Sequence, residues 1–393
     1  MVTEKQRRVL SLLIDPIKRL LEIKGFERLT EPQLEAIPEI VKGENVLLVA
    51  PTGTGKTEAA LIPILQMMLK VREEIGIKLI YITPLRALNR DLLDRISWWC
   101  NKLNFRVGVR HGDTPSRERR TQALHPPDIL ITTPETFQIL LNGKLLRRSL
   151  ETVKWVIIDE IHELAESKRG VQLILNLEKL RFLLGRDFQI VGLSATVGSP
   201  EKIANLLVGT GRSCKVIYVP VAKRMKLGVK YPIPTKEDYD LAEQLYTFPE
   251  VAARLREIKT LIERYKSALI FTNTRPTAEA LGSRFKLWDF KIPIEVHHGS
   301  LSVVPRVRAE RGLKLGELKA VVCTSSLELG IDIGNIELCI QYGSPRQITR
   351  LIQRVGRSGH KISEISNGVI IAQDPDDALE SIVIVKYAKE EKL

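Results

Sequence analysis

Residues 50–57 read APTGTGKT, and this stretch decides the fold of the chain. It follows an apolar run, Val46–Ala50, and opens a stretch of helical character, Thr57–Val71, so it joins a predicted strand to a predicted helix. Gly53 and Gly55 let the backbone curl until several N–H groups face one point, and the helix N-terminus adds positive potential there. Such a segment is typical of a phosphate-binding loop.

The side chains of this loop suit a nucleoside triphosphate. Lys56 would reach the β- and γ-phosphates, and the hydroxyl of Thr57 would ligate Mg²⁺. The usual pattern begins with glycine where this chain has Ala50, and a glycine-rich turn before a helix is the alternative, which the flanking elements disfavour. The loop predicts a nucleotide site formed by Pro51, Thr52, Gly53, Thr54, Gly55, Lys56 and Thr57.

Two adjacent carboxylates, Asp159 and Glu160, follow the apolar run Trp155–Ile158. Acidic residues at the C-terminal end of a parallel strand face the edge where such sheets bind ligands. We predict that Asp159 holds Mg²⁺ and that Glu160 polarises the attacking water as a general base. An exposed acidic turn is the alternative, and a phosphate loop roughly a hundred residues earlier argues against it.

Three polar residues beside these carboxylates are predicted to couple the nucleotide site to the rest of the protein. His162 lies two residues after Glu160, although a lone histidine is more often structural. Ser194 and Thr196 end another apolar run, where their hydroxyls could hydrogen-bond into the same network.

Strand-like apolar runs alternate with helical stretches in two segments of the chain. Those of the first segment are Val46–Ala50, Leu79–Thr83, Val107–Arg110, Ile129–Thr132, Trp155–Ile158 and Gln189–Leu193. Those of the second are Ala268–Phe271, Ile294–His297, Ala320–Cys323, Leu338–Gln341 and Gly368–Ala372. This alternation predicts two tandem α/β domains, each a mainly parallel sheet covered by helices on both faces. We place the first lobe at residues 1–210. Residues 211–393 then hold a linker, which includes Arg212–Lys236, followed by a helical stretch at Glu237–Tyr265 and the second lobe.

Composition narrows the class of protein. The 393 residues suit two or three domains. The 60 basic and 47 acidic residues give a net charge of +13, which suits a polyanionic partner but is weak evidence for one on its own. No apolar run approaches the roughly 18 residues of a membrane span, and the N-terminus lacks a signal-peptide cleavage site. The four cysteines form no CxxC pair, so we expect reduced thiols in a cytoplasmic protein rather than zinc ligands or disulfides.

An arginine pair stands near the end of the second segment, in QRVGRSGH at residues 353–360. Arg354 and Arg357 are spaced i, i+3 and would point the same way from a helix. Phosphoryl transfer is accelerated by cations placed on the developing charge, often arginines from a separate domain. A basic helical face is the more common meaning of such a pair, and the residues alone leave both interpretations open.

Taken in order, the segments APTGTGKT, TPLRAL, TTPET, DEIH, SAT, LIFTNTR, TSSLELGIDIG and QRVGRSGH resemble the motifs of superfamily 2 helicases. Longer stretches resemble one branch, the Lhr (large helicase-related) family. They are Arg110–Arg120, Pro126–Phe137, Val156–Gly170, Val191–Glu201, His297–Ser302 and Ser325–Gln347. The resemblance covers the chain from about Thr30 to Gln373.

The resemblance implies two RecA-like lobes that share one ATP site, with ATP and Mg²⁺ as cofactors. It implies that Gln33 reads the adenine edge, with Phe26 packing on the base, and that Gly330 and Asp332 line the second lobe's side of the nucleotide. Gln353, Arg354 and Arg357 would meet the γ-phosphate. Loops at strand ends would contact nucleic acid through Pro84, Arg86, Gly112, Thr133, Pro134, Thr272, Asn273, His298, Gly299, Thr324 and Ser325. Arg119 and Arg169 could add attraction, although a solvated surface charge explains each equally well.

The resemblance further implies an ATP-dependent translocase or helicase that moves 3′-to-5′ on single-stranded DNA. Its substrates would be DNA or RNA–DNA duplexes, in a DNA-repair-type role, as a nucleoid-associated monomer. Two departures stand out: His360, where many superfamily 2 relatives have arginine although histidine fits the Lhr branch, and an end at Leu393, where family members usually continue into further domains. The second departure keeps open an ATP-gated nucleic-acid clamp or annealing module that unwinds little. A third possibility, a P-loop NTPase acting on another substrate, leaves the second-lobe motifs without a role.

Overall fold

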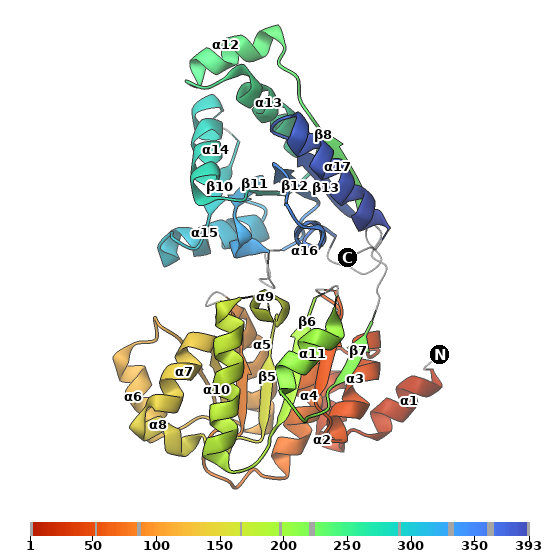
Figure 1. Ribbon diagram of the computed structural model, residues 1–393, viewed down its shortest axis with the longest axis vertical. Helices are drawn as coiled ribbons and strands as arrows, with labels where there is room; N and C mark the ends of the chain where they lie inside the picture. The colour runs from red at the N-terminus through yellow and green to blue at the C-terminus, as the bar shows by residue number, and fades with distance from the viewer. Residues whose placement is uncertain are drawn as a thin grey trace. The chain divides into compact units, whose positions relative to one another are not determined.

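The computed structural model describes residues 3–51, 53–84, 88–165, 167–195, 199–219, 225–289, 292–328, 334–359 and 365–390 (Figure 1). The chain divides into two compact units, residues 1–220 and 221–393. The sequence placed this boundary at residue 210. The first unit extends further because Lys215–Tyr218 forms a strand that pairs with Val46–Val49 in its sheet.

The described part of the first unit contains a seven-stranded sheet with the order β3-β4-β2-β5-β6-β1-β7. Every pairing in it is parallel. Four of the inner strands, β1, β2, β4 and β5, are buried at every position because helices cover both faces, which explains their continuous apolar runs. The strands are β1 (Val46–Val49), β2 (Leu79–Ile82), β3 (Val107–Arg110), β4 (Ile129–Thr132), β5 (Trp155–Ile158), β6 (Gln189–Ser194) and β7 (Lys215–Tyr218).

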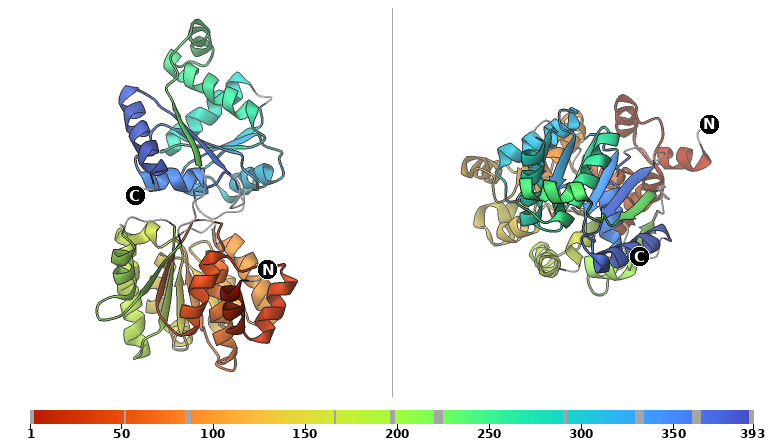
Figure 2. Two further views of the ribbon diagram at one scale, coloured as in Figure 1. Left: turned by 90° about the vertical axis from the view of Figure 1, so that its right-hand side faces the viewer. Right: turned by 90° about the horizontal axis from the view of Figure 1, so that it is seen from above.

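The helices of the first unit connect these strands and lie on both sides of the sheet (Figures 1 and 2). On one face, Phe137, Leu173 and Leu207 pack with Leu47 and Ile80 in the main apolar core. The helices are α1 (Glu4–Ser11), α2 (Asp15–Ile23), α3 (Glu31–Val41), α4 (Lys56–Leu69), α5 (Leu88–Leu103), α6 (Ser116–Leu124), α7 (Pro134–Asn142), α8 (Lys144–Ser149), α9 (His162–Ala165), α10 (Lys168–Leu184) and α11 (Pro200–Val208).

The described part of the second unit contains a six-stranded parallel sheet with the order β10-β11-β9-β12-β13-β8. Its strands are β8 (Met225–Lys230), β9 (Ala268–Phe271), β10 (Ile294–His297), β11 (Ala320–Cys323), β12 (Leu338–Tyr342) and β13 (Ser366–Ile371). Its helices are α12 (Lys236–Gln244), α13 (Pro249–Arg264), α14 (Arg275–Trp288), α15 (Val303–Lys314), the 3₁₀ turn η1 (Ser325–Leu327), α16 (Ile348–Val355) and α17 (Pro375–Lys389). Residues of α13 and α14 pack on one face of this sheet in a second apolar core.

The predicted fold class is confirmed: both units are parallel α/β sheets with covering helices. The predicted linker Arg212–Lys236, however, contains strands β7 and β8, which end the two sheets. These edge strands are only partly buried and contain polar residues, so they do not read as continuous apolar runs in the sequence. The single helical stretch predicted at Glu237–Tyr265 is two helices, separated by a turn in which Tyr246 has a φ of 48°.

The four cysteines are free thiols, of which Cys100, Cys323 and Cys339 are buried and Cys214 is half-buried. Burial raises the pKa of Cys100 and Cys214 to about 12 and raises the pKa of Cys323. Such thiols carry little thiolate at neutral pH. In the described part of the chain, no helix is long and apolar enough to cross a membrane.

Gly170 allows α10 to approach α9, the short helix that follows the two adjacent carboxylates. A Cβ on Gly170 would lie 2.0 Å from the carbonyl oxygen of Leu164. Backbone would have to move, so we expect Gly170→Ala to lower the free energy of unfolding by about 1–3 kcal/mol, measured by chemical denaturation. Gly143→Ala is the matched control, since its Cβ would meet nothing closer than 3.5 Å. Equal stability of the two variants would contradict the prediction.

Candidate functional site

In each unit the predicted site residues gather at one edge of the sheet. Because the strands are parallel, their C-terminal ends meet at the same edge. In the first unit this edge carries Pro84 after β2, Gly112 after β3, Thr133 after β4 and Asp159 after β5. The phosphate loop follows β1, and Ser194 is the last residue of β6.

The phosphate loop has the backbone that its glycines predict. Gly53 and Gly55 have φ values of 78° and 84°, and Gly55 caps the N-terminus of α4. The Nζ of Lys56 donates to the carbonyl oxygens of Ala50 at 2.6 Å and Ser194 at 3.0 Å. The ammonium group therefore lies where β1 and β6 end, beside the loop. Thr52 lies outside the described residues.

Gln33 braces this loop. Its Oε1 accepts from the backbone N–H of Thr30 at 3.0 Å, and its Nε2 donates to the carbonyl oxygen of Gly55 at 3.3 Å. The hydroxyl of Thr30 donates to the carbonyl oxygen of Thr54 at 2.8 Å. The start of α3 is thus tied to the phosphate loop, while the contact of Gln33 with adenine stays a prediction.

Phe26 lies half-buried just before this helix. Its ring meets that of Trp99 edge to face, with centroids 6.1 Å apart. The Nζ of Lys24 lies 4.8 Å from the centroid of Trp99 and 4.5 Å from that of Trp98. The ring of Phe26 therefore already has an aromatic partner in α5, and its packing on a base stays a prediction.

Tyr81 lies beside the two residues predicted to bind Mg²⁺. Its hydroxyl donates to Oδ2 of Asp159 at 2.7 Å, and the side chain of Thr57 lies near the same hydroxyl. Burial and the charge of Glu160 raise the pKa of Asp159 to about 6, while the Tyr81 bond and the nearby Lys56 act in the opposite direction. Burial and the charge of Asp159 raise the pKa of Tyr81, so its hydroxyl stays protonated and able to donate. The sequence did not single out Tyr81, since a tyrosine in an apolar strand is usually a core residue.

Glu160 holds a backbone conformation that is uncommon for a residue with a side chain. Its φ is 49°, in the left-handed region, and its backbone N–H donates to Oδ1 of Asp159 at 2.9 Å. Its Oε2 is buried and receives no hydrogen bond within the described part of the chain. Backbone strain of this kind concentrates at functional sites. Oε2 of Glu160 thus keeps an acceptor position that the described residues do not fill.

His162 lies beside Glu160 and is bonded to the end of β6. Its Nδ1 accepts from the backbone N–H of Ala195 at 3.2 Å and lies 3.4 Å from the hydroxyl of Ser194 and 3.6 Å from Oε2 of Glu160. Burial, and secondarily the charge of Lys56, lower the pKa of His162 to about 3. The ring is therefore neutral, with its proton on Nε2. Thr196, its other predicted partner, lies outside the described residues.

The loops predicted to bind nucleic acid in the first unit are fastened to one another. Arg169 donates to Oε1 of Glu135 at 2.6 Å and to the carbonyl oxygen of Pro84 at 3.0 Å. Arg119 donates to the carbonyl oxygen of Gly112 at 2.7 Å. Both arginines thus shape loops as well as adding charge. Arg86 lies outside the described residues.

Thr133 and Pro134 begin α7. The hydroxyl of Thr133 accepts the backbone N–H of Thr136 at 3.4 Å, and Pro134 occupies the first turn, where no N–H is needed. The helix N-terminus at this edge presents backbone N–H groups, which suit a phosphate contact.

The second unit places its predicted residues at the matching edge. Thr272 and Asn273 follow β9, His298 and Gly299 follow β10, and Thr324 and Ser325 follow β11. The Nε2 of His298 lies 2.6 Å from Oε1 of Glu279, which holds the ring in place. Thr272 is buried, whereas Gly299 and Ser325 are exposed. Gly330 and Asp332 lie outside the described residues.

The side chain of Arg354 is held inside the second unit by a carboxylate. It is 2% exposed, and its Nε donates to Oε1 of Glu328 at 2.6 Å. Arg357 donates from Nε to the backbone carbonyl of Glu328 at 2.8 Å, and Gln353 on α16 is half-buried. The structure therefore gives Arg354 an interior role, while the assignments of Arg357 and Gln353 stay predictions. The sequence did not identify Glu328 as the partner of the two arginines. The only indication was that this carboxylate lies within an apolar stretch.

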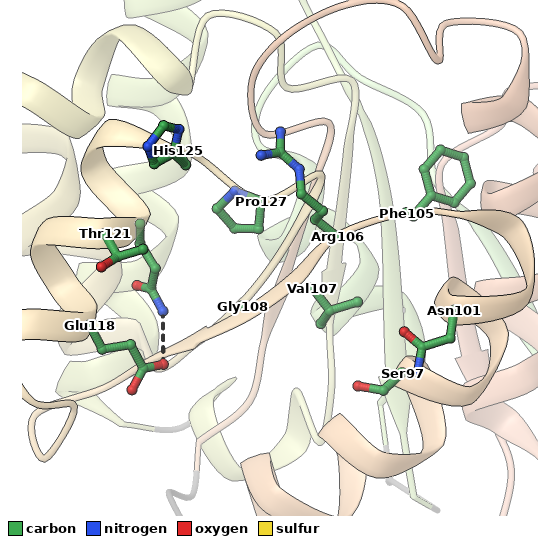
Figure 3. A pocket seen from close by; sticks show the side chains of 11 residues that line it. Ser97, Asn101, Phe105, Arg106, Val107, Gly108, Glu118, Thr121, His125 and Pro127 are labelled. Atoms are coloured by element: carbon green, nitrogen blue, oxygen red, sulfur yellow. Dashed lines mark hydrogen bonds between the residues drawn. The ribbon is translucent and has the colours of Figure 1, made fainter.

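A hollow of about 470 Å³ lies elsewhere in the first unit, beside edge strand β3 and between α5 and α6 (Figure 3). Asn101, Val107, Thr121 and His125 are among its lining residues. Strands β4, β2, β5 and β6 separate it from the phosphate loop after β1. It is therefore distinct from the sheet edge that carries the predicted chemistry.

The donor set fits Mg²⁺ rather than a metal held by protein alone. The described residues contain no group of three or more His, Cys, Asp or Glu side chains that could hold a metal ion. Mg²⁺ is usually bound through one or two carboxylates together with substrate phosphates. The buried carboxylate of Asp159 and the hydroxyl of Thr57, which both lie near Tyr81, match that requirement.

Comparison with known proteins defines the class. Residues 30–203 match the DEAD/DEAH box helicase family, and residues 251–361 match the helicase conserved C-terminal domain. Each match lies within one unit of the structure. The two units are thus the tandem RecA-like domains of a superfamily 2 helicase.

Comparison with individual proteins identifies a narrower family within this class. The chain is 40% identical over 98% of its length to the ATP-dependent helicase Lhr-Core protein 2 of Thermococcus barophilus, and 42% identical over 94% to the Lhr-Core helicase of Methanothermobacter thermautotrophicus. It covers 46% and 45% of those proteins, so it spans about half the length of the curated relatives it matches. The structure of the Mycobacterium smegmatis helicase Lhr bound to ssDNA and AMP-PNP aligns with a TM-score of 0.81 and 36% identity, over 97% of this chain and 50% of that one. The chain belongs to the Lhr family, as its motifs predicted.

Gly55 offers a direct test of the nucleotide site. Its φ of 84° and the 2.6 Å that would separate a Cβ from Nε2 of Gln33 make an alanine costly. We expect Gly55→Ala to weaken binding of a fluorescent ATP analogue by about 10-fold or more, because left-handed backbone alone costs about 1–2 kcal/mol.

Gly211→Ala is the control for Gly55→Ala. Gly211 also has a positive φ, of 78°, but a Cβ there would meet nothing within 4 Å. Its strain should lower stability while nucleotide affinity stays within about twofold of the parent. Unchanged affinity in Gly55→Ala would place the nucleotide away from this loop.

Proposed function

We propose that this protein is an ATP-dependent nucleic-acid translocase and helicase of the Lhr type. The observation that carries the proposal is the cluster at one sheet edge, where Tyr81 donates to Asp159, and Thr57 and the ammonium group of Lys56 lie nearby. This cluster can hold a nucleoside triphosphate and its metal ion. Both helicase domains accompany it in one chain.

Each residue of the cluster has a proposed part in ATP hydrolysis. Lys56 holds the β- and γ-phosphates, and Thr57 and Asp159 hold Mg²⁺. When bound, that ion neutralises charge on the phosphate oxygens. Glu160 orients and deprotonates the attacking water, and the neutral ring of His162 beside it accepts a hydrogen bond from Ala195 at the end of β6. Arg357 contacts the γ-phosphate and stabilises the charge that develops there.

Single-stranded DNA is the proposed track. A relative that is 36% identical has been solved with ssDNA and an ATP analogue, which supports the same ligand here. Backbone amides and short hydroxyls at the strand ends, such as those of Gly112, Thr133 and Ser325, suit phosphate contacts that follow a strand without reading its sequence. We propose 3′-to-5′ movement, unwinding of DNA or RNA–DNA duplexes, and a DNA-repair-type role at the nucleoid.

A second candidate is an ATP-gated clamp or annealing module. The chain covers 46% of its relative's length, so residues that open the duplex in that relative can lie outside the matched half. Strand displacement on 3′-tailed, 5′-tailed and blunt duplexes separates the two candidates. Displacement confined to 3′-tailed duplexes supports the helicase, whereas ATP hydrolysis without displacement on any duplex supports the clamp.

The central experiment measures ATP hydrolysis with and without single-stranded DNA. We expect DNA to stimulate the parent protein, Lys56→Ala to abolish hydrolysis, and Arg357→Ala to lower the stimulated kcat by about 10³-fold, as for arginines that stabilise phosphoryl transfer. Arg308→Ala is the matched control because the side chain of Arg308 on α15 is 78% exposed. Absence of stimulation, with Arg357→Ala as active as the parent, would sink the proposal.

Tyr81→Phe tests whether Tyr81 supports the proposed Mg²⁺ site. The change removes the hydroxyl that donates to Asp159 at 2.7 Å and leaves a buried ring of nearly the same size. We expect the Mg²⁺ concentration for half-maximal ATP hydrolysis to rise about 10-fold, as when a residue that orients a metal ligand is lost.

Tyr218→Phe, at the half-exposed end of β7, is the control for Tyr81→Phe. It should leave the Mg²⁺ dependence unchanged. If Tyr81→Phe and Tyr218→Phe require the same Mg²⁺ concentration, Tyr81 does not support a metal site.

A further inference from the structure

A polar network lies inside the second unit, on the face of the sheet opposite α13 and α14. Leu338, Ile340 and Tyr342 of β12 face the apolar core beneath those helices. Since side chains alternate along a strand, Cys339 and Gln341 point to the other face. There the Sγ of Cys339 donates to the backbone carbonyl of Arg354 at 3.0 Å, and Gln341 accepts a hydrogen bond from the guanidinium of Arg354.

Arg354 is the centre of this network. Its Nε donates to Oε1 of Glu328 at 2.6 Å, its Nη2 pairs with the same oxygen, and its Nη1 donates to Oδ1 of Asn273 at 3.1 Å and to Gln341. The guanidinium also lies 5.3 Å from the ring centroid of Phe271. The planar fork of arginine thus joins the segments after β9 and β11 to strand β12, a geometry that the single ammonium of lysine cannot reproduce.

The network has two ends with different proposed ligands. Asn273 is exposed in the loop after β9, which is proposed to contact nucleic acid. Glu328 is 3% exposed, and its backbone carbonyl accepts from Nε of Arg357, the residue proposed to contact the γ-phosphate. Arg354 therefore bonds to the nucleic-acid loop on one side and, through Glu328, to the γ-phosphate arginine on the other.

A direct phosphate contact by Arg354 is disfavoured by the same geometry. To reach a ligand, its guanidinium would have to leave Glu328, and that carboxylate would stay buried without its charge partner. Removing one member of a buried ion pair is strongly unfavourable.

We propose that Arg354 is a positioning residue, which, through Glu328, makes the placement of Arg357 depend on whether the Asn273 loop holds nucleic acid. The inference rests on the proposed function, since it assigns the coupling between its two ligands. It predicts that breaking the network lowers the maximal rate that DNA can elicit, without weakening DNA binding to the same extent.

The experiment measures steady-state ATP hydrolysis while single-stranded DNA is titrated to saturation. For Arg354→Lys and Glu328→Gln, we expect the plateau kcat to fall about 10-fold or more, while the KM for ATP and the DNA concentration for half-maximal stimulation change less than about threefold. A merely structural loss would change the fraction of folded protein, which circular dichroism and thermal unfolding report. A residue that touches phosphate would raise the KM for ATP.

Asn273→Ala keeps the test decisive if the buried variants do not fold, because this side chain is exposed. If Asn273 couples the two ligands, Asn273→Ala lowers the plateau kcat. If Asn273 only contacts DNA, the variant raises the DNA concentration for half-maximal stimulation and leaves the plateau unchanged. Asp238→Asn is the matched control: it weakens another buried ion pair of this unit, with Arg256 at 2.9 Å, away from both proposed ligands. We expect it to lower thermal stability and to preserve the plateau.

The outcomes separate the two proposals. If the parent protein shows no stimulation by DNA, the proposed function fails and the coupling falls with it. If the parent is stimulated and Arg354→Lys or Asn273→Ala reaches the same plateau, the coupling alone is overturned. A rise in the KM for ATP with an unchanged plateau would return Arg354 to the phosphate contact that the sequence predicted.

Discussion

Parallel strand pairing is the constraint on which both units depend. In a parallel sheet the crossover helices send every strand in the same direction, so residues far apart in the chain reach one edge. Lys56, Asp159 and Ser194 are separated by long helical segments, yet the Nζ of Lys56 lies 3.0 Å from the carbonyl oxygen of Ser194. The loops at that edge can change without disturbing the buried strands beneath them. The residues predicted for binding and chemistry thus gather at one edge of each sheet.

Beneath each edge, one buried polar residue organises the loops above it. In the first unit, Tyr81 holds Asp159 with a single neutral hydroxyl, near Thr57. In the second, Arg354 holds Glu328, Gln341 and Asn273 with a charged fork. A neutral donor beside Asp159 leaves that carboxylate able to accept a cation, whereas the charge of Glu328 is already matched by Arg354. This difference favours a metal site in the first unit and a positioning network in the second.

Sequence alone predicted what depends on local pattern and missed what depends on distant partners. Ile129–Thr132 and Trp155–Ile158 are strands with the predicted bounds because buried strands read as continuous apolar runs. Strands β7 and β8 escaped because only part of each is buried. Tyr81 gave no signal, since only the fold brings its hydroxyl to Asp159, 78 positions away. The i, i+3 spacing of Arg354 and Arg357 predicted that Arg354 faces a ligand. That spacing cannot reveal the carboxylate of Glu328, 26 positions earlier, which holds the guanidinium of Arg354 inside the unit.

The burial of the cysteines has a practical consequence for spectroscopy. Cys100, Cys323 and Cys339 are shielded, and the raised pKa of Cys214 leaves it almost entirely protonated at neutral pH. Maleimide dyes react with thiolates, so the native protein should give little background labelling. Cysteines introduced at Phe182 and Tyr246, which are 91% and 93% exposed, would carry one dye in each unit. Energy transfer between them would test whether the distance between the two dyes changes when ATP is added, without removing any native thiol.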